Sequence, residues 1–312
     1  MRIGFFGTPD LARDILAACH KAGHEIVYIV SQPDKPVGRR SDLQPSPVSL
    51  FAIDQNILLL RPERIRENFE FLSTLKSHLV DFIIVVAYGK ILPLSILQLP
   101  KYMSINVHWS LLPRYRWASP IQTALLEGDR VTGVTIMTMS EWMDEGDILS
   151  THEISISNDE TTATLFEKFA QIAPQVLLDA LDGIVEGTIS PIPQSTTGVT
   201  YTKKFDRVDG KIDFLSHSAL EIYRKYQAFT PWPWVWTVCN GVRLKIHTVE
   251  LESGIHNLLP GECRASGEHQ VLIWTNSGVV CLGDVTLEWS KRRSSQEFFL
   301  GDHSVDIKRV FV

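Results

Sequence analysis

Residues 2–22 read RIGFFGTPDLARDILAACHKA, which is a short apolar run, a tight turn and then an amphipathic segment. The run at residues 2–6 predicts a buried strand. Leu11, Ile15 and Ala18 share one stripe of the segment 10–22, which predicts a helix that stops at Gly23. Apolar runs and helical segments keep alternating through the first half, which predicts a parallel sheet covered by helices. Further strands are expected at residues 25–30, 57–60, 81–87, 103–107 and 133–139.

The second half of the chain has a different pattern. A long helix is expected at residues 165–184, kinked by Pro174, and residues 187–198 are rich in Ser, Thr, Pro and Gly. Such a stretch is typical of a connection between domains. A helix is then expected near residues 219–229, and short β-rich runs follow at 235–239, 242–249, 270–275, 279–285 and 307–312.

These patterns predict two domains and an α/β fold class. The first, at residues 1–187, is expected to hold a Rossmann-like, mostly parallel sheet. The second, at residues 207–312, is expected to be a small OB-like β-barrel, although a sandwich fits the same short strands. Residues 188–206 would be the linker.

The charge of the chain limits its partners. The 312 residues include 30 Lys and Arg against 36 Asp and Glu, a net charge of -6, which argues against a general binder of polyanions. From Arg207 onward there are 12 basic and 12 acidic residues, so the preceding part has 18 and 24 and carries the whole -6. We therefore expect weak nonspecific affinity for nucleic acid, with room for one local basic patch.

Cysteines and hydropathy predict a cytoplasmic protein with no membrane segment. The four cysteines lie far apart and form no C-x-x-C pair, as expected of reduced thiols. The most apolar run, residues 79–88, carries Asp81 and is too short to cross a bilayer.

The first turn, Gly4-Phe-Phe-Gly7, invites comparison with a dinucleotide fingerprint. It lacks the third glycine of G-x-G-x-x-G and the acidic residue about 20 positions further on. A tight turn between strand and helix is the simpler interpretation. An NAD-dependent oxidoreductase stays a hypothesis that a dinucleotide-binding assay would eliminate.

Polar residues that suit acyl-transfer chemistry follow two of the expected strands. Asn106 and His108 are two positions apart, so they point to the same face at the carboxyl end of a strand, where ligands usually bind. Their nitrogens form a donor pair suited to a developing oxyanion, although they could equally be satisfied polar residues that close the strand. Asp144 lies in an acidic turn, where it would either favour a protonated His108 or cap backbone N–H groups.

Three motifs together resemble the formyltransferases that use 10-formyltetrahydrofolate. They are Asn106-Val-His108-x-Ser110-Leu-Leu-Pro113, Thr132-Gly-Val-Thr-Ile136 and Asp144-x-Gly146-Asp147. Within that group the resemblance is to the methionyl-tRNA formyltransferases, and it extends over nearly the whole chain. Supporting segments are Phe6-Gly-Thr-Pro-Asp10, Gln32-Pro-Asp34, Pro45-Ser-Pro-Val48, Val86-Ala-Tyr-Gly89, Ala118-Ser-Pro-Ile-Gln122, Val199-Thr-Tyr201 and Ala228-Phe-x-Pro-Trp-Pro233.

The resemblance implies a reaction and catalytic residues. The formyl group of 10-formyltetrahydrofolate would pass to the α-amine of methionine on initiator tRNA, with no metal. Asn106 and protonated His108 would hold the formyl oxygen, while His108 or a water held by Asp144 would carry a proton to the leaving nitrogen.

The resemblance also implies binding residues and partners. The first domain would be catalytic, the second would help to bind tRNA, and we expect a monomer. The basic loop after the second strand would contact tRNA through Arg39 and Arg40. The folate-binding residues implied are Tyr88, Gly89, Lys90, Ile91, Leu92, Ser110, Leu111, Leu112, Pro113 and Met143.

Two tryptophans depart from the family pattern. Trp109 stands where relatives commonly carry a small residue or proline, and Trp117 stands where glycine is usual. If that glycine serves a positive φ, Trp117 will be strained or the loop rebuilt, with a reshaped entrance to the site.

Two other functions remain open. The folate motifs would also suit an enzyme that formylates another amine, such as a nucleotide amino sugar or glycinamide ribonucleotide. A catalytically silent module that binds tRNA or folate is the second alternative, but it would ordinarily have lost one of Asn106, His108 and Asp144.

Overall fold

A computed structural model describes the chain except for residues 38–41, 240, 254–258 and 301–312. The chain forms two compact units. The first contains residues 1–120, 131–155 and 166–202, and the second contains 121–130, 156–165 and 203–312. Most of the expected linker therefore belongs to the first unit, and two short segments of the expected first domain belong to the second unit. The continuous boundaries given above stay a prediction.

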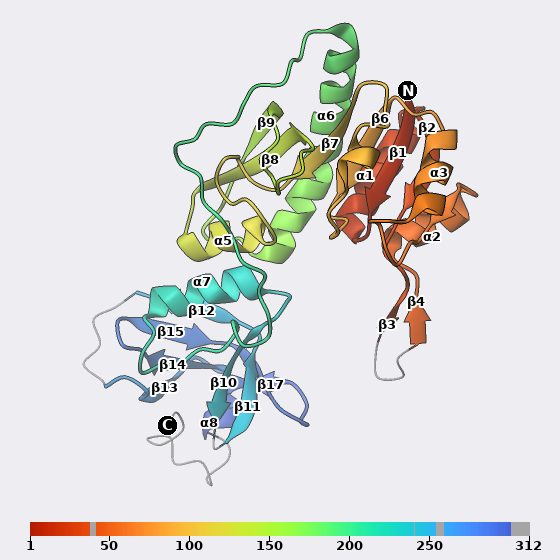
Figure 1. Ribbon diagram of the computed structural model, residues 1–312. Helices are drawn as coiled ribbons and strands as arrows, with labels where there is room; N and C mark the ends of the chain where they lie inside the picture. The colour runs from red at the N-terminus through yellow and green to blue at the C-terminus, as the bar shows by residue number, and fades with distance from the viewer. Residues whose placement is uncertain (38–41, 240, 254–258, 301–312) are drawn as a thin grey trace. The chain divides into compact units, whose positions relative to one another are not determined.

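The first unit is built on one seven-stranded sheet (Figure 1). Its order is β5 (Leu59–Leu60), β2 (Glu25–Val30), β1 (Arg2–Gly7), β6 (Phe82–Val86), β7 (Met103–His108), β8 (Val131–Thr138) and β9 (Ile148–Ser155). Strands from β5 to β7 are parallel, and β8 and β9 are antiparallel additions. The mostly parallel, Rossmann-like sheet is confirmed. The sequence missed β9 because its outer residues are polar, as on an edge strand.

Helices of the first unit follow their apolar stripes. In α1 (Asp10–Lys21), buried side chains recur at Leu11, Ile15 and Cys19. The predicted long helix is α6 (Thr162–Glu186), with Pro174 inside it. Shorter elements that the sequence did not predict are α2 (Pro47–Asp54), α3 (Phe69–Ser77), α4 (Leu94–Leu97) and the paired strands β3 (Lys35–Val37) and β4 (Asp42–Gln44).

The two glycines of the first turn are explained by packing. A Cβ on Gly4 would lie 2.3 Å from the ring of Tyr28, and one on Gly7 would lie 2.8 Å from the Cβ of Ala12. Both glycines lie within β1 and let neighbouring elements approach closely, so close packing explains them.

Strand order places a ligand crevice at a defined edge of this sheet. The chain runs from β1 outward to β2 and β5, then returns to add β6 on the other side of β1. In parallel sheets, ligands bind beyond the carboxyl ends of the strands at such a reversal. The ends of β1, β6 and β7 therefore frame the place where a site is expected.

The second unit contains two four-stranded antiparallel sheets. The predicted helix precedes their strands in the sequence. That helix is α7 (Ala219–Phe229), which starts at a capping box of Ser218 and Glu221. One sheet has the order β10 (Val235–Cys239), β11 (Val242–Ile246), β16 (Asp284–Leu287), β17 (Arg293–Ser294). The other has the order β12 (Val249–Glu252), β15 (Val279–Leu282), β14 (Gln270–Trp274), β13 (Cys263–Ser266). The helices α5 (Pro120–Glu127) and α8 (Ser295–Leu300) complete the list of elements.

Two of the predicted β runs each contribute a strand to both sheets. The run 242–249 divides into β11 and β12, and the run 279–285 divides into β15 and β16. The two points at which these runs divide lie side by side, because the N–H of Gly283 donates to the carbonyl of Thr248 at 3.1 Å. A Cβ on Gly283 would lie 2.9 Å from the Cβ of Thr248, so glycine permits this crossing. Hydrogen bonds between the described strands thus form two sheets, and the run 307–312 lies outside the described residues.

In the part of the chain that the structure describes, no helix has the length and hydropathy needed to cross a bilayer.

A half-buried histidine makes the second unit sensitive to acid. His247 lies against the ring of Trp234 and within hydrogen-bond distance of Thr286. Burial, with the charges of Lys245 and Arg292, lowers its pKa from 6.5 to about 4. Between these values the unfolded chain takes up a proton that the folded chain refuses, so stability falls as the pH drops from 6.5 to about 4.

His247→Gln should flatten this pH dependence. Urea midpoints of the full chain, followed by tryptophan fluorescence between pH 4 and 7, would measure it. The exposed His269→Gln provides the matched control and should keep the wild-type slope. A wild-type slope in His247→Gln would contradict the assignment.

Candidate active site

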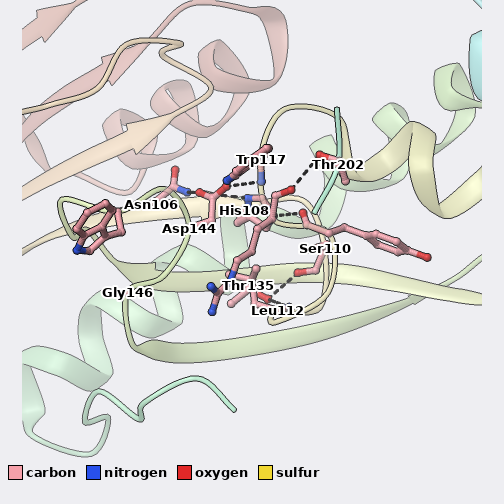
Figure 2. Close-up of polar contacts among 12 residues, drawn as sticks. Asn106, His108, Ser110, Leu112, Trp117, Thr135, Asp144, Gly146 and Thr202 are labelled. Atoms are coloured by element: carbon pink, nitrogen blue, oxygen red, sulfur yellow. Dashed lines mark hydrogen bonds and ion pairs between the residues drawn. The ribbon is translucent and has the colours of Figure 1, made fainter. Parts of the chain in front are cut away.

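Three side chains from two separate parts of the sequence converge at the carboxyl end of β7 (Figure 2). Asn106 and His108 lie on β7, and Asp144 lies in the turn between β8 and β9. The Asn106 Nδ2 atom is 3.5 Å from Asp144 Oδ1, and the His108 Nδ1 atom is 3.7 Å from the same oxygen. Two nitrogens and one carboxylate thus surround one small space next to the expected crevice.

The strand and a backbone contact fix the imidazole. Asn106 and His108 are two positions apart on β7, and this spacing places them on one face, as predicted. The Nε2 atom of His108 lies 2.9 Å from the carbonyl oxygen of Tyr115. A carbonyl only accepts, so Nε2 donates in this contact and Nδ1 is the atom directed at Asp144. The ring itself is 5% exposed.

Asp144 caps one backbone N–H group and also lies beside both nitrogens of the donor pair. Its Oδ2 atom accepts the N–H of Trp117 at 2.8 Å, while Oδ1 faces Asn106 and His108. Its backbone is left-handed, with φ 58°. One carboxylate therefore holds a loop in place and also borders the donor pair.

Contacts with β8 hold the acidic turn closely. Thr138 accepts the N–H of Asp147 on its hydroxyl at 2.9 Å and donates its own N–H to the Asp147 carbonyl at 2.8 Å. A Cβ on Gly146 would lie 1.8 Å from the Thr138 carbonyl oxygen. Only glycine fits there, which explains the Asp-x-Gly-Asp order of this turn.

Gln194 supports the same turn from the segment expected to be a linker. Its Nε2 atom donates to the carbonyls of Asp144 at 2.9 Å and Gly146 at 2.7 Å. Its Oε1 atom accepts from Arg116 at 2.9 Å, and Arg116 also pairs with Glu145 at 3.1 Å. Sequence reasoning missed Gln194 and Arg116, because nothing in a Ser- and Thr-rich stretch distinguishes this glutamine from a solvated one.

Replacing Gln194 with methionine should lower kcat by about 10- to 100-fold, because catalysis is sensitive to displacements near 1 Å. Methionine has a similar size but donates no hydrogen bond, so the turn that carries Asp144 would lose two supports. Steady-state formylation kinetics would measure the effect. The control is Gln175→Met on α6, where the glutamine is exposed and bonds to Asp179. Equal kcat in the two variants would contradict a positioning role for Gln194.

The predicted folate signature at residues 110–113 is a tightly held turn. The buried Ser110 donates its hydroxyl to the Arg114 carbonyl at 2.6 Å. Thr135 on β8 donates to the Ser110 carbonyl at 2.6 Å and accepts the N–H of Leu112 at 3.2 Å. Leu111 fills the space above Gly133, whose added Cβ would lie 2.5 Å from it. Hydrogen bonds to Thr135, which belongs to the motif Thr132-Gly-Val-Thr-Ile136, thus hold this turn in place.

The second predicted folate segment follows β6. The side chains of Tyr88 and Leu92 are buried in the core. Lys90 donates its ammonium to the carbonyls of Pro62 and Glu63. Gly89, at φ 78°, is exposed, as is Ile91. Contacts from Tyr88 and Leu92 to a ligand would therefore come from their backbone.

Remaining predicted residues have different environments. Met143, next to Asp144, is 51% exposed and Pro113 is half-buried. Trp109 packs against Phe169 and is 9% exposed, so it belongs to the core rather than the entrance. Arg39 and Arg40 lie outside the described residues.

Comparisons with known proteins cover nearly the whole chain. The formyl transferase family model matches residues 1–181, and the model of the formyl transferase C-terminal domain matches residues 204–303. The methionyl-tRNA formyltransferase of Caldicellulosiruptor saccharolyticus is 40% identical over 304 residues, which cover 96% of this chain and 97% of that protein. The methionyl-tRNA formyltransferase of Lachnospira eligens is 39% identical over 307 residues, with 97% of both chains covered.

Solved structures share the fold at lower identity. HypX from Aquifex aeolicus in complex with tetrahydrofolic acid has a TM-score of 0.67 and 18% identity, covering 96% of this chain and 48% of that one. The sugar 3N-formyl transferase WlaRD, in the presence of dTDP and 5-N-formyl-THF, has a TM-score of 0.66 and 18% identity, covering 93% and 99%. At this identity the likeness shows the fold alone. Together, the two family models and the full-length relatives show that the chain belongs to the formyl transferase family, within the group of the methionyl-tRNA formyltransferases.

Proposed function

We propose that this enzyme transfers the formyl group of 10-formyltetrahydrofolate to the α-amine of methionine esterified to initiator tRNA. The observation that carries the proposal is the convergence of Asn106 and His108 on one oxygen of Asp144, at 3.5 and 3.7 Å. Full-length relatives named for this activity support the choice of acceptor.

Residues next to the trio fit a reduced pterin. The loop after β6 adjoins Asn106, because Val85 pairs with Asn106 in the sheet. In this loop the exposed Gly89 offers backbone groups for the polar edge of a pterin, and exposed Ile91 offers an apolar wall. Met143 offers a second apolar contact next to Asp144. When bound, the folate would supply a formyl group on a nitrogen that leaves as an amine.

The donor pair suits the charge that develops during transfer. As the amine forms its bond to the formyl carbon, negative charge grows on the formyl oxygen. Asn106 Nδ2 can donate to it, and so can His108 Nδ1 when the ring is an imidazolium that carries a proton on both nitrogens. One proton must also pass from the attacking amine to the folate nitrogen as the old C–N bond breaks. Asp144 can accept and return that proton through an ordered water, so the residues end in their starting state.

Binding of tRNA would be shared between the units. We assign Arg39 and Arg40 to phosphate contacts of the acceptor arm and the second unit to selection of the acceptor. A monomer in the cytoplasm, with no metal, would suffice for this chemistry.

A formylation assay with 10-formyltetrahydrofolate tests donor and acceptor together. Initiator and elongator Met-tRNA are compared at one controlled salt concentration, since phosphate contacts depend on salt. We expect formylation of initiator Met-tRNA at a kcat/KM well above that of the elongator. An enzyme that formylated a nucleotide amino sugar and left Met-tRNA unmodified would refute the proposal.

A further inference from the structure

Trp117 has a backbone conformation that large side chains rarely adopt. Its φ is 86°, in the left-handed region that costs free energy for any residue with a Cβ. Yet its side chain is not buried to compensate, because 47% of it is exposed. Core packing therefore does not explain this strained, half-exposed tryptophan beside Asp144. Strain of this kind is usually retained for a function.

The surrounding backbone enforces this conformation. The Trp117 N–H donates to Asp144 Oδ2 at 2.8 Å. The preceding residue, Arg116, donates its N–H to the Thr200 carbonyl at 3.0 Å, and its carbonyl accepts the N–H of Thr202 at 2.9 Å. The hydroxyl of Thr202 also donates to that carbonyl at 3.0 Å. Arg116 and Tyr201 thus pair in an isolated β-bridge, and Trp117 follows Arg116 directly. The backbone that carries the indole is therefore held in place.

The indole forms an open aromatic pair with Tyr201. The two ring centroids are 5.0 Å apart, and the planes are tilted by 53°. Tyr201 is 52% exposed, so both rings keep free surface. The pair Trp109 and Phe169 is the contrast, since Trp109 is 9% exposed and serves the core. An aromatic pair that stays half-exposed, and whose Trp117 donates its N–H to Asp144, is suited to a flat ligand.

Tyr201 also borders a cavity of about 550 Å³. The residues that line it include Asp147, Ser195 and the ion pair of Arg116 with Glu145. Side chains of these kinds form hydrogen bonds with sugar hydroxyls, and the volume lies within the range usual for small ligands, about 300–1,000 Å³. A planar ring on the aromatic pair and a sugar next to it would therefore both find suitable surroundings.

We propose that Trp117 and Tyr201 form a stacking surface for the adenine of the 3′-terminal nucleoside of the acceptor tRNA. The inference rests on the proposed function. Methionine is esterified to the ribose of that nucleoside, so its base must lie close to the site once the amine reaches Asn106 and Asp144. Stacking on aromatic side chains is the usual way in which proteins hold an unpaired base.

Two small acceptors isolate the contribution of the base. One is methionine esterified to the 3′-oxygen of adenosine, and the other is the same ester on 1,4-anhydro-D-ribitol, which keeps the sugar ring and lacks the base. The ratio of their kcat/KM values is measured for the wild-type enzyme and for Trp117→Gly. Glycine accepts the φ of 86° and keeps the N–H that Asp144 binds. We expect a wild-type ratio of at least about fivefold and a ratio near one in the variant.

Conservative variants separate stacking from other roles. Tyr201→Phe keeps the ring and should retain the wild-type ratio, whereas Tyr201→Ala should lower it. An equal fall of both kcat/KM values in Trp117→Gly, with the ratio unchanged, would overturn the inference, because it would show a role for Trp117 in loop position only. A ratio near one in Tyr201→Phe would also overturn the inference, since that result would assign the preference for the base to the tyrosine hydroxyl.

The proposed function can fail separately. If the wild-type enzyme formylates no Met-tRNA, the acceptor has been assigned wrongly. If it formylates Met-tRNA and Trp117→Gly leaves the ratio unchanged, only the stacking surface is refuted.

Discussion

Replacing Asn106 with alanine is expected to lower kcat for formyl transfer by at least ~100-fold, as loss of one oxyanion donor typically does. The side chain lies on β7 with Nδ2 directed at the same space as His108 Nδ1. Alanine removes the amide donor from the place where negative charge develops. Among the described contacts of Asp144, no other side chain supplies a donor in its place. Single-turnover rates with saturating 10-formyltetrahydrofolate and Met-tRNA would measure the loss. Asp144→Ala should show a loss of at least the same size.

Affinity for tRNA should change little in Asn106→Ala, because one amide contributes little to a large interface. Filter binding of Met-tRNA at fixed salt checks this. The control is Asn276→Ala, in a surface turn of the second unit, which should keep wild-type turnover. If Asn106→Ala turned over at the wild-type rate, Asn106 would have no role in holding the formyl oxygen.

Replacing Gly146 with alanine is expected to lower kcat by about 100-fold through displacement of Asp144, since a shift near 1 Å has effects of this size. The new Cβ would lie 1.8 Å from the Thr138 carbonyl oxygen, which belongs to the backbone at the end of β8. No flexible side chain can move aside, so the turn itself must shift. The measurement is kcat together with the urea midpoint, which shows whether the chain stays folded.

Gly23→Ala is the matched control for this variant. Gly23 has φ 85° and no atom within 4 Å of an added Cβ, so alanine there is strained but meets no clash. It lies after α1, away from the site. We expect a lower urea midpoint with unchanged kcat. A Gly146→Ala enzyme with wild-type kcat would show that the turn tolerates displacement and that Asp144 needs no fixed position.

The elements of the fold were predictable where burial and periodicity coincide. Strands β1, β2 and β6 are almost entirely apolar and largely buried, while β7 is apolar on one face and carries Ser104, Asn106 and His108 on the other. The bounds of all four agree with the prediction to within one residue. The helices α1 and α7 were equally clear, with stops or caps at Gly23 and Ser218. Edge strand β9 and short elements such as α4 gave no signal, because polar edges and single turns lack a period.

The division of two β runs between sheets could not be predicted either. Runs 242–249 and 279–285 are continuous as apolar patterns, and the crossing depends on a contact between Gly283 and Thr248. That contact joins residues 35 positions apart, which no local window contains.

The sequence by itself determined the parallel sheet, the shared face of Asn106 and His108, and the family, because strand period and ordered motifs are local properties of the chain. Tertiary structure alone decided which groups support Asp144 beyond the predicted partners Asn106 and His108. Trp117 and Gln194 reach the acidic turn from 27 and 50 positions away, as the span of their hydrogen bonds shows. Their positions follow from how β7, β8 and residues 192–202 pack together, and such packing depends on contacts between distant residues that no periodicity records.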